Sequence, residues 1–331
     1  MSLMGIASAL TAATTSYHVP VLCAQAVQWL ITNPAGTYLD GTLGGGGHSA
    51  ALLDALRPHD GRLISVDRDP DALRAAGERL AADVSSGHVR LLRSNFGALP
   101  ELLRSMDDVG PLDGLLLDLG VSSHQIDEAS RGFSYARDGP LDMRMDQSAG
   151  GPGELTAAAI LNEWEGGAIA DVLWRHGDER ESRRIARAIV AARPLHTTAE
   201  LAAVVRAAGR KKEPKDVTKR LSRVFQALRI EVNAEMAELE AVLTGAARLV
   251  RPGGRLAVMS YHSLEDRRAK RLLRSGSFTD DEPPKDVYGN VLAPWRPLTR
   301  QPIVASDEEV AANSRARSAR LRVGERTEHD R

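Results

Sequence analysis

The chain has 331 residues, of which 43% are hydrophobic and 26% charged, with a formal net charge of -1. This composition is typical of a globular protein with one large domain and an insertion, or with two domains. It gives no overall sign of nucleic-acid binding, which would depend on local basic patches. Cys23 is the only cysteine, which excludes a disulfide framework and a cysteine zinc site. No apolar run approaches the ~18 residues of a membrane-spanning helix, and we expect a cytoplasmic protein in a reducing compartment.

The amino-terminal residues 1–16 are small and apolar but lack the basic start of a signal peptide, so we expect a mobile extension. After a helix that runs to Leu30, a short apolar strand ends at Asp40. Four glycines follow at 44–47, and a helix begins near His48. Strand, glycine turn and helix in this order predict the start of a nucleotide-binding βαβ unit, because glycines let the backbone approach a ligand closely.

A second acidic residue strengthens this prediction. Asp67 ends the next apolar run, roughly 20 residues beyond the glycines, which is the spacing at which a carboxylate meets a ribose diol. Taken singly, the glycine turn could be only a tight connection, and Asp67 could be only a cap of the following helix. No Gly-Lys-Ser/Thr follows the glycines, and Ser49 stands where a dinucleotide fingerprint needs its third glycine. The pattern Asp40-x-x-x-Gly44-x-Gly46 is instead similar to that of enzymes that use S-adenosylmethionine.

The remaining elements predict an α/β fold. Further strands are expected at 89–92, 113–118 and 255–260, with two weaker ones at 298–304 and 318–323. Helices are expected at 70–82, 181–193, 198–208 and 217–250. Because strands four and five are far apart and helical patterns separate them, we expect an inserted helical domain at 131–214. The segments 17–130 and 215–331 would then form the sheet domain.

Several polar segments are candidates for chemistry. Residues 118–125 leave strand four at the edge where doubly wound sheets bind ligands, although Asp118 and Ser122 could simply cap the next turn. The loop 131–146 is rich in charge, glycine and aromatics, so it either binds something or is a flexible connector. His262 follows strand five and could orient a base or brace the rim. Three basic stretches could neutralise RNA phosphates, although such runs usually form solvated helix faces. They are 206–223, 267–271 and the arginines of 315–322.

Taken together, these segments resemble one family, the bacterial 16S ribosomal RNA cytosine-N4 methyltransferases known as RsmH or MraW. The resemblance extends from His18 to about Arg326. Its most specific motif is Asp138-Gly139-Pro140-Leu141-Asp142-Met143-Arg144-Met145-Asp146. The other matching segments are 18–22, 40–42, 46–49, 67–70, 117–123, 131–134, 184–189, 225–230, 260–267 and 315–318. Gly45 and His124 depart from the usual family residues without affecting the expected activity.

The resemblance implies a class I S-adenosylmethionine-dependent methyltransferase (Rossmann-like) sheet with a helical insertion for RNA. Its substrate would be one cytidine in the decoding region of 16S RNA, within the small ribosomal subunit. The implied cofactor-binding residues are Gly46, Gly47 and His48 on the glycine turn, Asp67 at the ribose, Phe96 beside the adenine, and Asp118 and Gln125 closing the pocket. A homodimer is left open.

The chemistry of the expected reaction limits the remaining residues. The lone pair of a cytosine N4 amine is delocalised into the ring, which makes the amine a poor nucleophile. The site must therefore accept hydrogen bonds from its N–H groups and hold the nitrogen in line with the methyl group. Oxygen acceptors serve this purpose and no metal is needed. We predict Ser122, Asp142 and His262 on the base side. Methylation at ring carbon 5 would need a cysteine nucleophile, and Cys23 lies in the leading helix.

Two other functions compete with this one. A nicotinamide-dependent (NAD(P)) oxidoreductase could use the same sheet, although the missing third glycine speaks against it. A non-catalytic RNA-binding assembly factor could retain the pocket as a relic, although Gly46, Asp67 and Asp118 are all intact.

Overall fold

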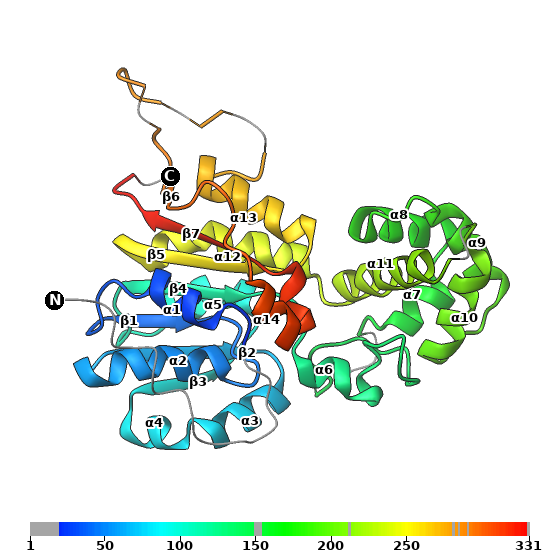
Figure 1. Ribbon diagram of the computed structural model, residues 1–331, viewed down its shortest axis with the longest axis horizontal. Coiled ribbons are helices and arrows are strands. Elements are labelled where there is room, and N and C mark those ends of the chain that lie inside the picture. The colour runs from blue at the N-terminus through cyan, green and yellow to red at the C-terminus, as the bar shows by residue number, and fades with distance from the viewer. Residues whose placement is uncertain are drawn as a thin grey trace.

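A seven-stranded sheet lies at the centre of the computed structural model, which describes residues 20–148, 154–210, 213–279, 282–283, 285–289 and 291–329 (Figure 1). The extension expected at 1–16 lies outside these residues. The strand order is β3-β2-β1-β4-β5-β7-β6. The strands are β1 Thr37–Asp40, β2 Arg62–Asp67, β3 Val89–Arg93, β4 Leu112–Asp118, β5 Val250–Ser260, β6 Trp295–Pro297 and β7 Arg320–Arg326.

The first five strands are parallel, while β7 runs antiparallel to β5 and β6 antiparallel to β7. The continuous apolar run of β4 explains its central position. Leu115 and Leu117 pack into the core on one face of the sheet, and Leu116 packs into the core on the other. All three are fully buried, as expected for a strand covered by helices on both sides.

Helices cover both faces of this sheet. Side chains of α5, α12 and α13 belong to one core cluster, and those of α1 and α2 belong to the other. The helices of the sheet domain are α1 Cys23–Leu30, α2 Gly47–Leu56, α3 Pro70–Arg79, α4 Ala81–Ser86, α5 Leu99–Arg104, α6 Ser123–Asp127, α12 Glu235–Leu249, α13 Ser263–Ser275 and α14 Asp307–Ala312. Short 3-10 turns are η1 Arg57–His59, η2 Phe96–Ala98, η3 Ala129–Arg131 and η4 Ser314–Ser318. No helix of the described residues is long and apolar enough to cross a bilayer.

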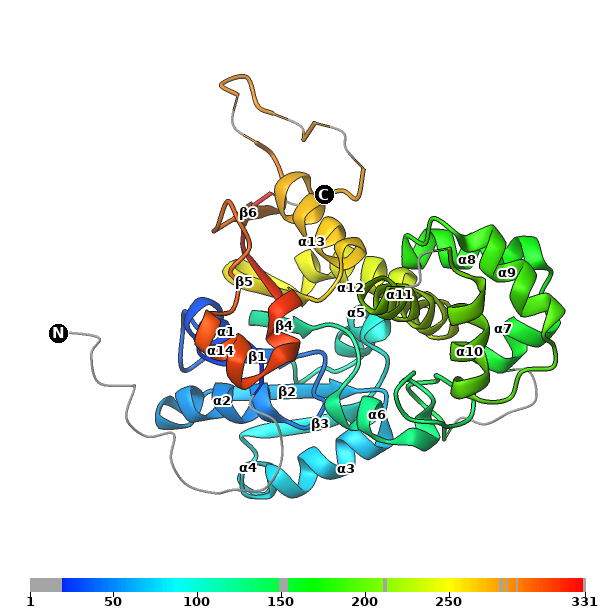
Figure 2. The same ribbon diagram turned by 45° about the vertical axis from the view of Figure 1, so that its right-hand side comes forward.

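Five helices between β4 and β5 pack around a core cluster of their own, beside the sheet (Figures 1 and 2). They are α7 Ala157–Glu163, α8 Gly166–Gly177, α9 Ser182–Ala191, α10 Thr198–Ala208 and α11 Pro214–Val232. Leu221, Val224, Phe225 and Leu228 of α11 recur at helical spacing and enter this cluster. The same helix then leads back toward the sheet.

Three sequence expectations are wrong in detail. The helix expected at 217–250 is two helices, because Ala234 adopts a left-handed φ of 51° between α11 and α12. The side chain of Asn233 fixes this break through bonds to distant backbone, which the helical periodicity could not reveal. The helix expected at 70–82 divides at Leu80 into α3 and α4. The strand expected at 298–304 is replaced by β6, and of those residues only Ile303 forms a β-bridge, to Leu321.

Candidate active site

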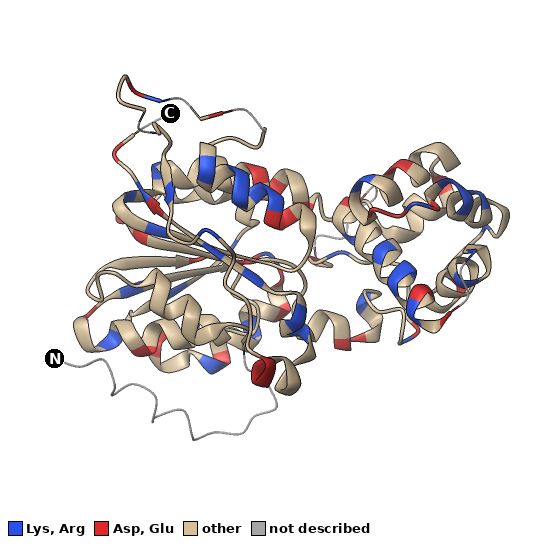
Figure 3. Cartoon of the chain, turned by 45° about the horizontal axis from the view of Figure 1, so that its top comes forward, with Lys and Arg blue, Asp and Glu red and all other residues tan. Residues whose placement is uncertain are grey.

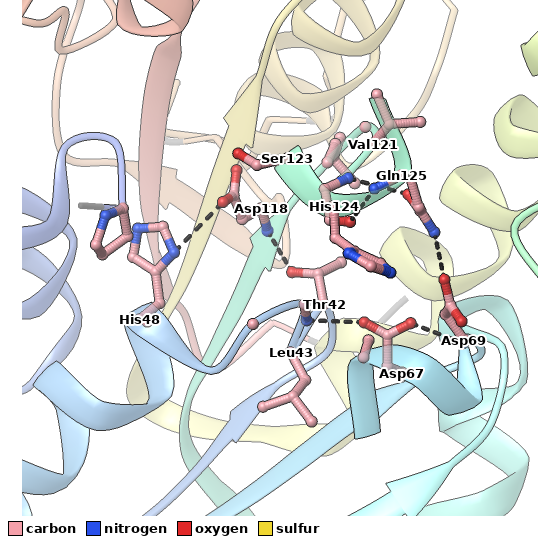
Figure 4. Close-up of a pocket in the computed structure, with 18 of the residues that line it drawn as sticks. Thr42, Leu43, His48, Asp67, Asp69, Asp118, Val121, Ser123, His124 and Gln125 are labelled. Carbon is pink, nitrogen blue, oxygen red and sulfur yellow. Dashed lines mark hydrogen bonds and ion pairs between the residues drawn. The ribbon is translucent and has the colours of Figure 1, made fainter. Parts of the chain in front are cut away.

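A cavity of about 360 Å³ opens at the carboxyl ends of the parallel strands (Figure 4). Its lining combines the glycine turn after β1, the end of β2, Phe96 after β3 and the segment 118–126 after β4. Tyr261 after β5, Met145, Arg229 of α11 and Arg315 of η4 complete it. The parallel sheet thus brings together residues that lie far apart in the sequence.

The glycine turn needs positive backbone angles. Gly44 and Gly46 have φ values of 50° and 73°, which L side chains rarely adopt. A Cβ on Gly46 would also lie 3.2 Å from the Cβ of Ala76 in α3. Gly46 therefore packs toward α3 and is not part of the cavity lining, whereas Gly47 and His48 of the predicted cofactor set do line it.

The buried carboxylate of Asp40 holds the residues around this turn in place. Asp40 is fully buried and accepts bonds from the Ser49 hydroxyl at 2.7 Å and the Thr42 amide at 3.1 Å. Burial raises the pKa of Asp40, and these bonds only partly offset the effect. Asp40 does not line the cavity, so its role is to hold the backbone of the turn and not to contact a ligand.

Asp67 joins the end of β2 to the same turn. Its carboxylate accepts the Gly44 amide at 2.8 Å and the Asp69 amide at 2.9 Å. Burial raises the pKa of Asp67 to about 6. A carboxylate has about four acceptor positions, so two remain for a ligand such as a ribose diol. Asp67 lines the cavity, as does Phe96, in agreement with a nucleoside lying along this edge.

Asp118 at the end of β4 lies between His48 and Tyr261. Its Oδ2 is 3.3 Å from Nδ1 of His48, and its Oδ1 accepts the Tyr261 hydroxyl at 2.9 Å (Figure 4). The other ring nitrogen of His48 is 2.9 Å from the carbonyl of Val21. Burial alone would lower the pKa of His48, but the hydrogen bond and charge of Asp118 outweigh it and raise the pKa. Because both ring nitrogens face acceptors, the imidazolium form fits this position.

Gln125 lines the cavity and bonds through both ends of its side-chain amide. Its Oε1 accepts the Ser122 amide at 3.0 Å, and its Nε2 donates to Oδ2 of Asp69 at 2.8 Å. The Ser122 hydroxyl in turn accepts the Gln125 amide at 3.2 Å, which forms a capping box at the start of α6. The buried guanidinium of Arg131 reaches the same oxygen of Asp69 at 2.9 Å. These bonds hold the loop after β4 against the loop after β2.

The three residues predicted on the base side are not brought together in the cavity. Ser122 lines it, and its hydroxyl caps α6 as the structural alternative supposed. Asp142 is not part of the lining. Burial opposes its ionisation, but bonds from Arg144 at 2.8 and 3.0 Å outweigh this and lower the pKa of Asp142. His262 lies behind the lining, with Nε2 at 3.0 Å from Glu265. Catalytic roles for Asp142 and His262 remain predictions.

A group of charged side chains surrounds His262. Ligand atoms of Glu235, His262 and Glu265 lie within 4.8 Å of one another, a set of side chains that metal ions use. Both oxygens of Glu235 already accept bonds from Arg229, at 2.7 and 2.9 Å, and Glu265 accepts the Tyr261 amide at 2.8 Å. The group therefore forms an ion-pair network that connects α11 and α12 to the end of β5.

Of the arginines in the lining, Arg68, Arg79 and Arg229 were not predicted as site residues, whereas Arg315 was among the basic residues considered for RNA contact. Arg229 belongs to the family-like segment 225–230, but no role was predicted for it. Its position in a helix did not indicate that it would line a pocket.

Three arginines of the basic stretches have partners within the protein. Arg320 and Arg322 pair with Asp266 at 3.0 and 2.6 Å, and Arg220 is buried beside Glu181. These three arginines are engaged within the protein.

The strand order, the glycine turn and the acid after β2 together define a class I S-adenosylmethionine-dependent methyltransferase. Residues 15–327 match the MraW methylase family, and the chain belongs to that family. S-adenosylmethionine is its cofactor, and the cavity offers an acid for the ribose beside a glycine turn, which fits this ligand. Membership of a methylase family sets the nicotinamide oxidoreductase aside.

Relatives and solved structures extend this comparison. The chain is 46% identical over 324 residues to Ribosomal RNA small subunit methyltransferase H of Chloroherpeton thalassium, covering 94% of this chain and 98% of that one. It is 48% identical over 334 residues to the protein of the same name from Chlorobium phaeovibrioides, covering 95% and 97%. The crystal structure of TrmN from Thermus thermophilus is 14% identical, covers 92% of this chain and 48% of that one, and has a TM-score of 0.41.

Proposed function

We propose that the protein transfers the methyl group of S-adenosylmethionine to the exocyclic N4 of one cytidine in the decoding region of 16S rRNA. The relatives named for small-subunit rRNA methylation support the substrate class, since they match nearly the whole chain. The observation that carries the proposal is the cavity itself. It joins an adenosine-type site at β1 and β2 to a polar wall after β4 and β5.

The residues of that wall suit an amine nucleophile. Once bound, the cofactor supplies an electrophilic methyl group on a sulfonium. The hydroxyl of Ser122 and the carboxylate of Asp118 offer oxygen acceptors at the end of β4, where an amine proton would need one. Charge on Asp118 is stabilised by His48 and Tyr261, so the wall stays polarised when water is excluded.

Methylation of the ring carbon fits the structure poorly. That reaction needs a thiolate to attack the pyrimidine ring. Burial raises the pKa of Cys23 to about 11, and this residue is not part of the cavity lining. The only cysteine of the chain is therefore a poor candidate nucleophile at neutral pH.

We further propose that residues 131–214 form the RNA-recognition domain and that 17–130 with 215–331 form the methyltransferase domain. Arg183, Arg184 and Arg187 are exposed on α9, opposite its buried face. Arg267, Lys270 and Arg274 form a second exposed row on α13 (Figure 3). Such rows suit phosphate contacts, and a cytoplasmic location would place them beside the small subunit. The homodimer considered from sequence has no support in the described residues or the relatives, and we do not propose it.

Labelled S-adenosylmethionine and small subunits from a strain that lacks the enzyme test the function. We expect label on the N4 of one cytidine, detected by nuclease digestion and mass spectrometry. Label on a ring carbon, on another nucleotide or on protein would overturn the assignment. Full methylation by an Asp118→Ala variant in cells would instead favour a non-catalytic assembly role for this chain.

A further inference from the structure

Arg229 is the one arginine of the cavity lining that is held by two bonds to a single carboxylate. Its Nε and Nη2 donate to Glu235 at 2.7 and 2.9 Å, and its side chain is only 14% exposed. No hydrogen bond from the third nitrogen, Nη1, is found within the part of the chain that the structure describes. A guanidinium held in this way has a fixed plane and retains unused donors.

Its position in the cavity points to the substrate side. Glu235, which holds Arg229, lies beside Glu265 and His262 at the end of β5, whereas Asp67 lies at the end of β2. These strands are three positions apart in the sheet, or about 14 Å at the usual strand spacing. A nucleoside held at β2 with its methyl donor directed toward β4 would leave the region near Arg229 for the acceptor base.

In the described part of the chain, the other arginines of the lining are not held by two bonds to one carboxylate. Arg79 donates to the carbonyl of Gly45 at 3.3 Å, on the glycine turn, and Arg68 to the carbonyl of Asn233 at 3.3 Å. Arg315 bonds the hydroxyl of Ser123 and lies 3.6 Å from Asp127. Arg229 thus combines a rigid fork, low exposure and free donors at the β5 side.

We propose that Arg229 reads the target base by donating from Nη1 to the adjacent O2 and N3 acceptors of cytosine. This inference rests on the proposed function and names a residue that determines its specificity. Cytosine presents two neighbouring acceptors beside its N4 amine, whereas uracil presents an N3–H donor that would face the guanidinium. Enzymes that act on extruded bases commonly recognise them through the Watson–Crick edge in this way. Glu235 is then the positioning residue that fixes the orientation of the fork.

Two variants test the inference. Arg229→Lys keeps the charge but loses the fork, and Arg229→Gln combined with Glu235→Gln removes both charges without leaving a buried carboxylate alone. We expect kcat/KM on small subunits to fall ~30-fold or more in each, which is the discrimination supplied by one good pair of base contacts. The affinity for S-adenosylhomocysteine, measured by calorimetry, should stay within about 3-fold of wild type. Arg248→Lys, at an exposed arginine of α12 outside the lining, is the matched control.

A second measurement separates base recognition from a merely structural role. Cytidine and uridine 5′-monophosphate are titrated into the wild type and both variants, each saturated with S-adenosylhomocysteine. The wild type should prefer the cytidine nucleotide, and both variants should lose the preference while their thermal unfolding stays cooperative. An unchanged preference, or unchanged kcat/KM, would overturn the role of Arg229 and leave the proposed function intact. A wild type that labels no cytidine N4 would refute the proposed function itself.

Discussion

Asp67 combines a structural and a ligand-binding position in one side chain. Both of its oxygens accept backbone amides, from Gly44 and Asp69, and the residue still lines the cavity. Two adjacent loops therefore depend on the same carboxylate that would hold a ribose. The place of Asp67 in the cavity lining could be predicted from sequence, since its position at a strand end after a glycine turn is a local property.

The pKa of Asp67 predicts how cofactor affinity depends on pH. Because burial raises that pKa to about 6, the carboxylate loses its charge as pH falls through this value. We expect the dissociation constant for S-adenosylmethionine to rise about 10-fold between pH 7.5 and 5, measured by calorimetry. Asp67→Asn should bind about 10- to 100-fold more weakly at pH 7.5 and show a flat profile over this range. A wild-type profile as flat as that of the variant would contradict the prediction.

His48 predicts a pH effect of the opposite kind on stability. Asp118 outweighs burial and raises the pKa of His48 above its ordinary value, so the folded state holds this proton more tightly than the unfolded chain. Its stabilising contribution is present below pH 6.5 and is lost as pH rises through the higher folded-state pKa. The difference in unfolding free energy between wild type and His48→Gln should therefore shrink from pH 6 to pH 9 in urea titrations. A difference that grows with pH would exclude the ion pair.

At the scale of elements, the break between α11 and α12 determines how the helical part joins the sheet. Asn233 donates to the carbonyl of Met143 at 2.7 Å and accepts the amide of Met145 at 2.8 Å. One side chain thus fixes the end of α11 against the loop 131–146. This loop is held by side-chain bonds over much of its length, which argues against a flexible connector.

Asn233→Ala removes these bonds and tests how much they contribute to the free energy of unfolding. A buried carbonyl and a buried amide would be left without partners, at a cost of about 2–4 kcal/mol in unfolding free energy. Urea unfolding should show this loss, and limited proteolysis should cut the variant near residues 131–146. Arg248→Ala, at an exposed position of α12, should change stability by less than about 0.5 kcal/mol. Equal stability of Asn233→Ala and wild type would show that the break is held by other contacts.

Local patterns predicted most elements but not their tertiary partners. The parallel strands and α10 could be predicted because buried apolar runs and helical periodicity are recorded in consecutive residues. The break at Ala234 and the place of Arg229 could not. The break depends on bonds from Asn233 to backbone atoms more than 80 residues away, and Arg229 is held by Glu235 of the next helix. Asp142 and His262 belonged to a specific motif, yet their side chains are engaged by Arg144 and Glu265.

For the whole molecule, the net charge is near zero, but the charged side chains are unevenly distributed over the surface. Arg267, Lys270 and Arg274 follow one face of α13, and no partner of their side chains is found within the described ranges. About 10 Å separates the first from the last along the helix, enough to meet two neighbouring phosphates. A protein without net positive charge can thus still bind RNA through one face.

Replacing the α13 row by glutamine tests this at the scale of the complex. The triple variant should bind small subunits ~10-fold more weakly at low salt, and its dependence of log Kd on log salt should flatten by about 2. Cofactor affinity should stay unchanged. Arg90→Gln, in β3 at the opposite edge of the sheet from β7 and β6, should keep the wild-type salt dependence. A triple variant with wild-type salt dependence would move the RNA contact to α9 or elsewhere.

The shared oxygen of Asp69 has a consequence for mutational studies. Asp69 accepts Gln125 at 2.8 Å and Arg131 at 2.9 Å on one oxygen, while the other receives the Asp71 amide and caps α3. Defects introduced at Gln125 and at Arg131 should therefore fail to sum in a thermodynamic cycle, because each perturbs the environment of the same atom.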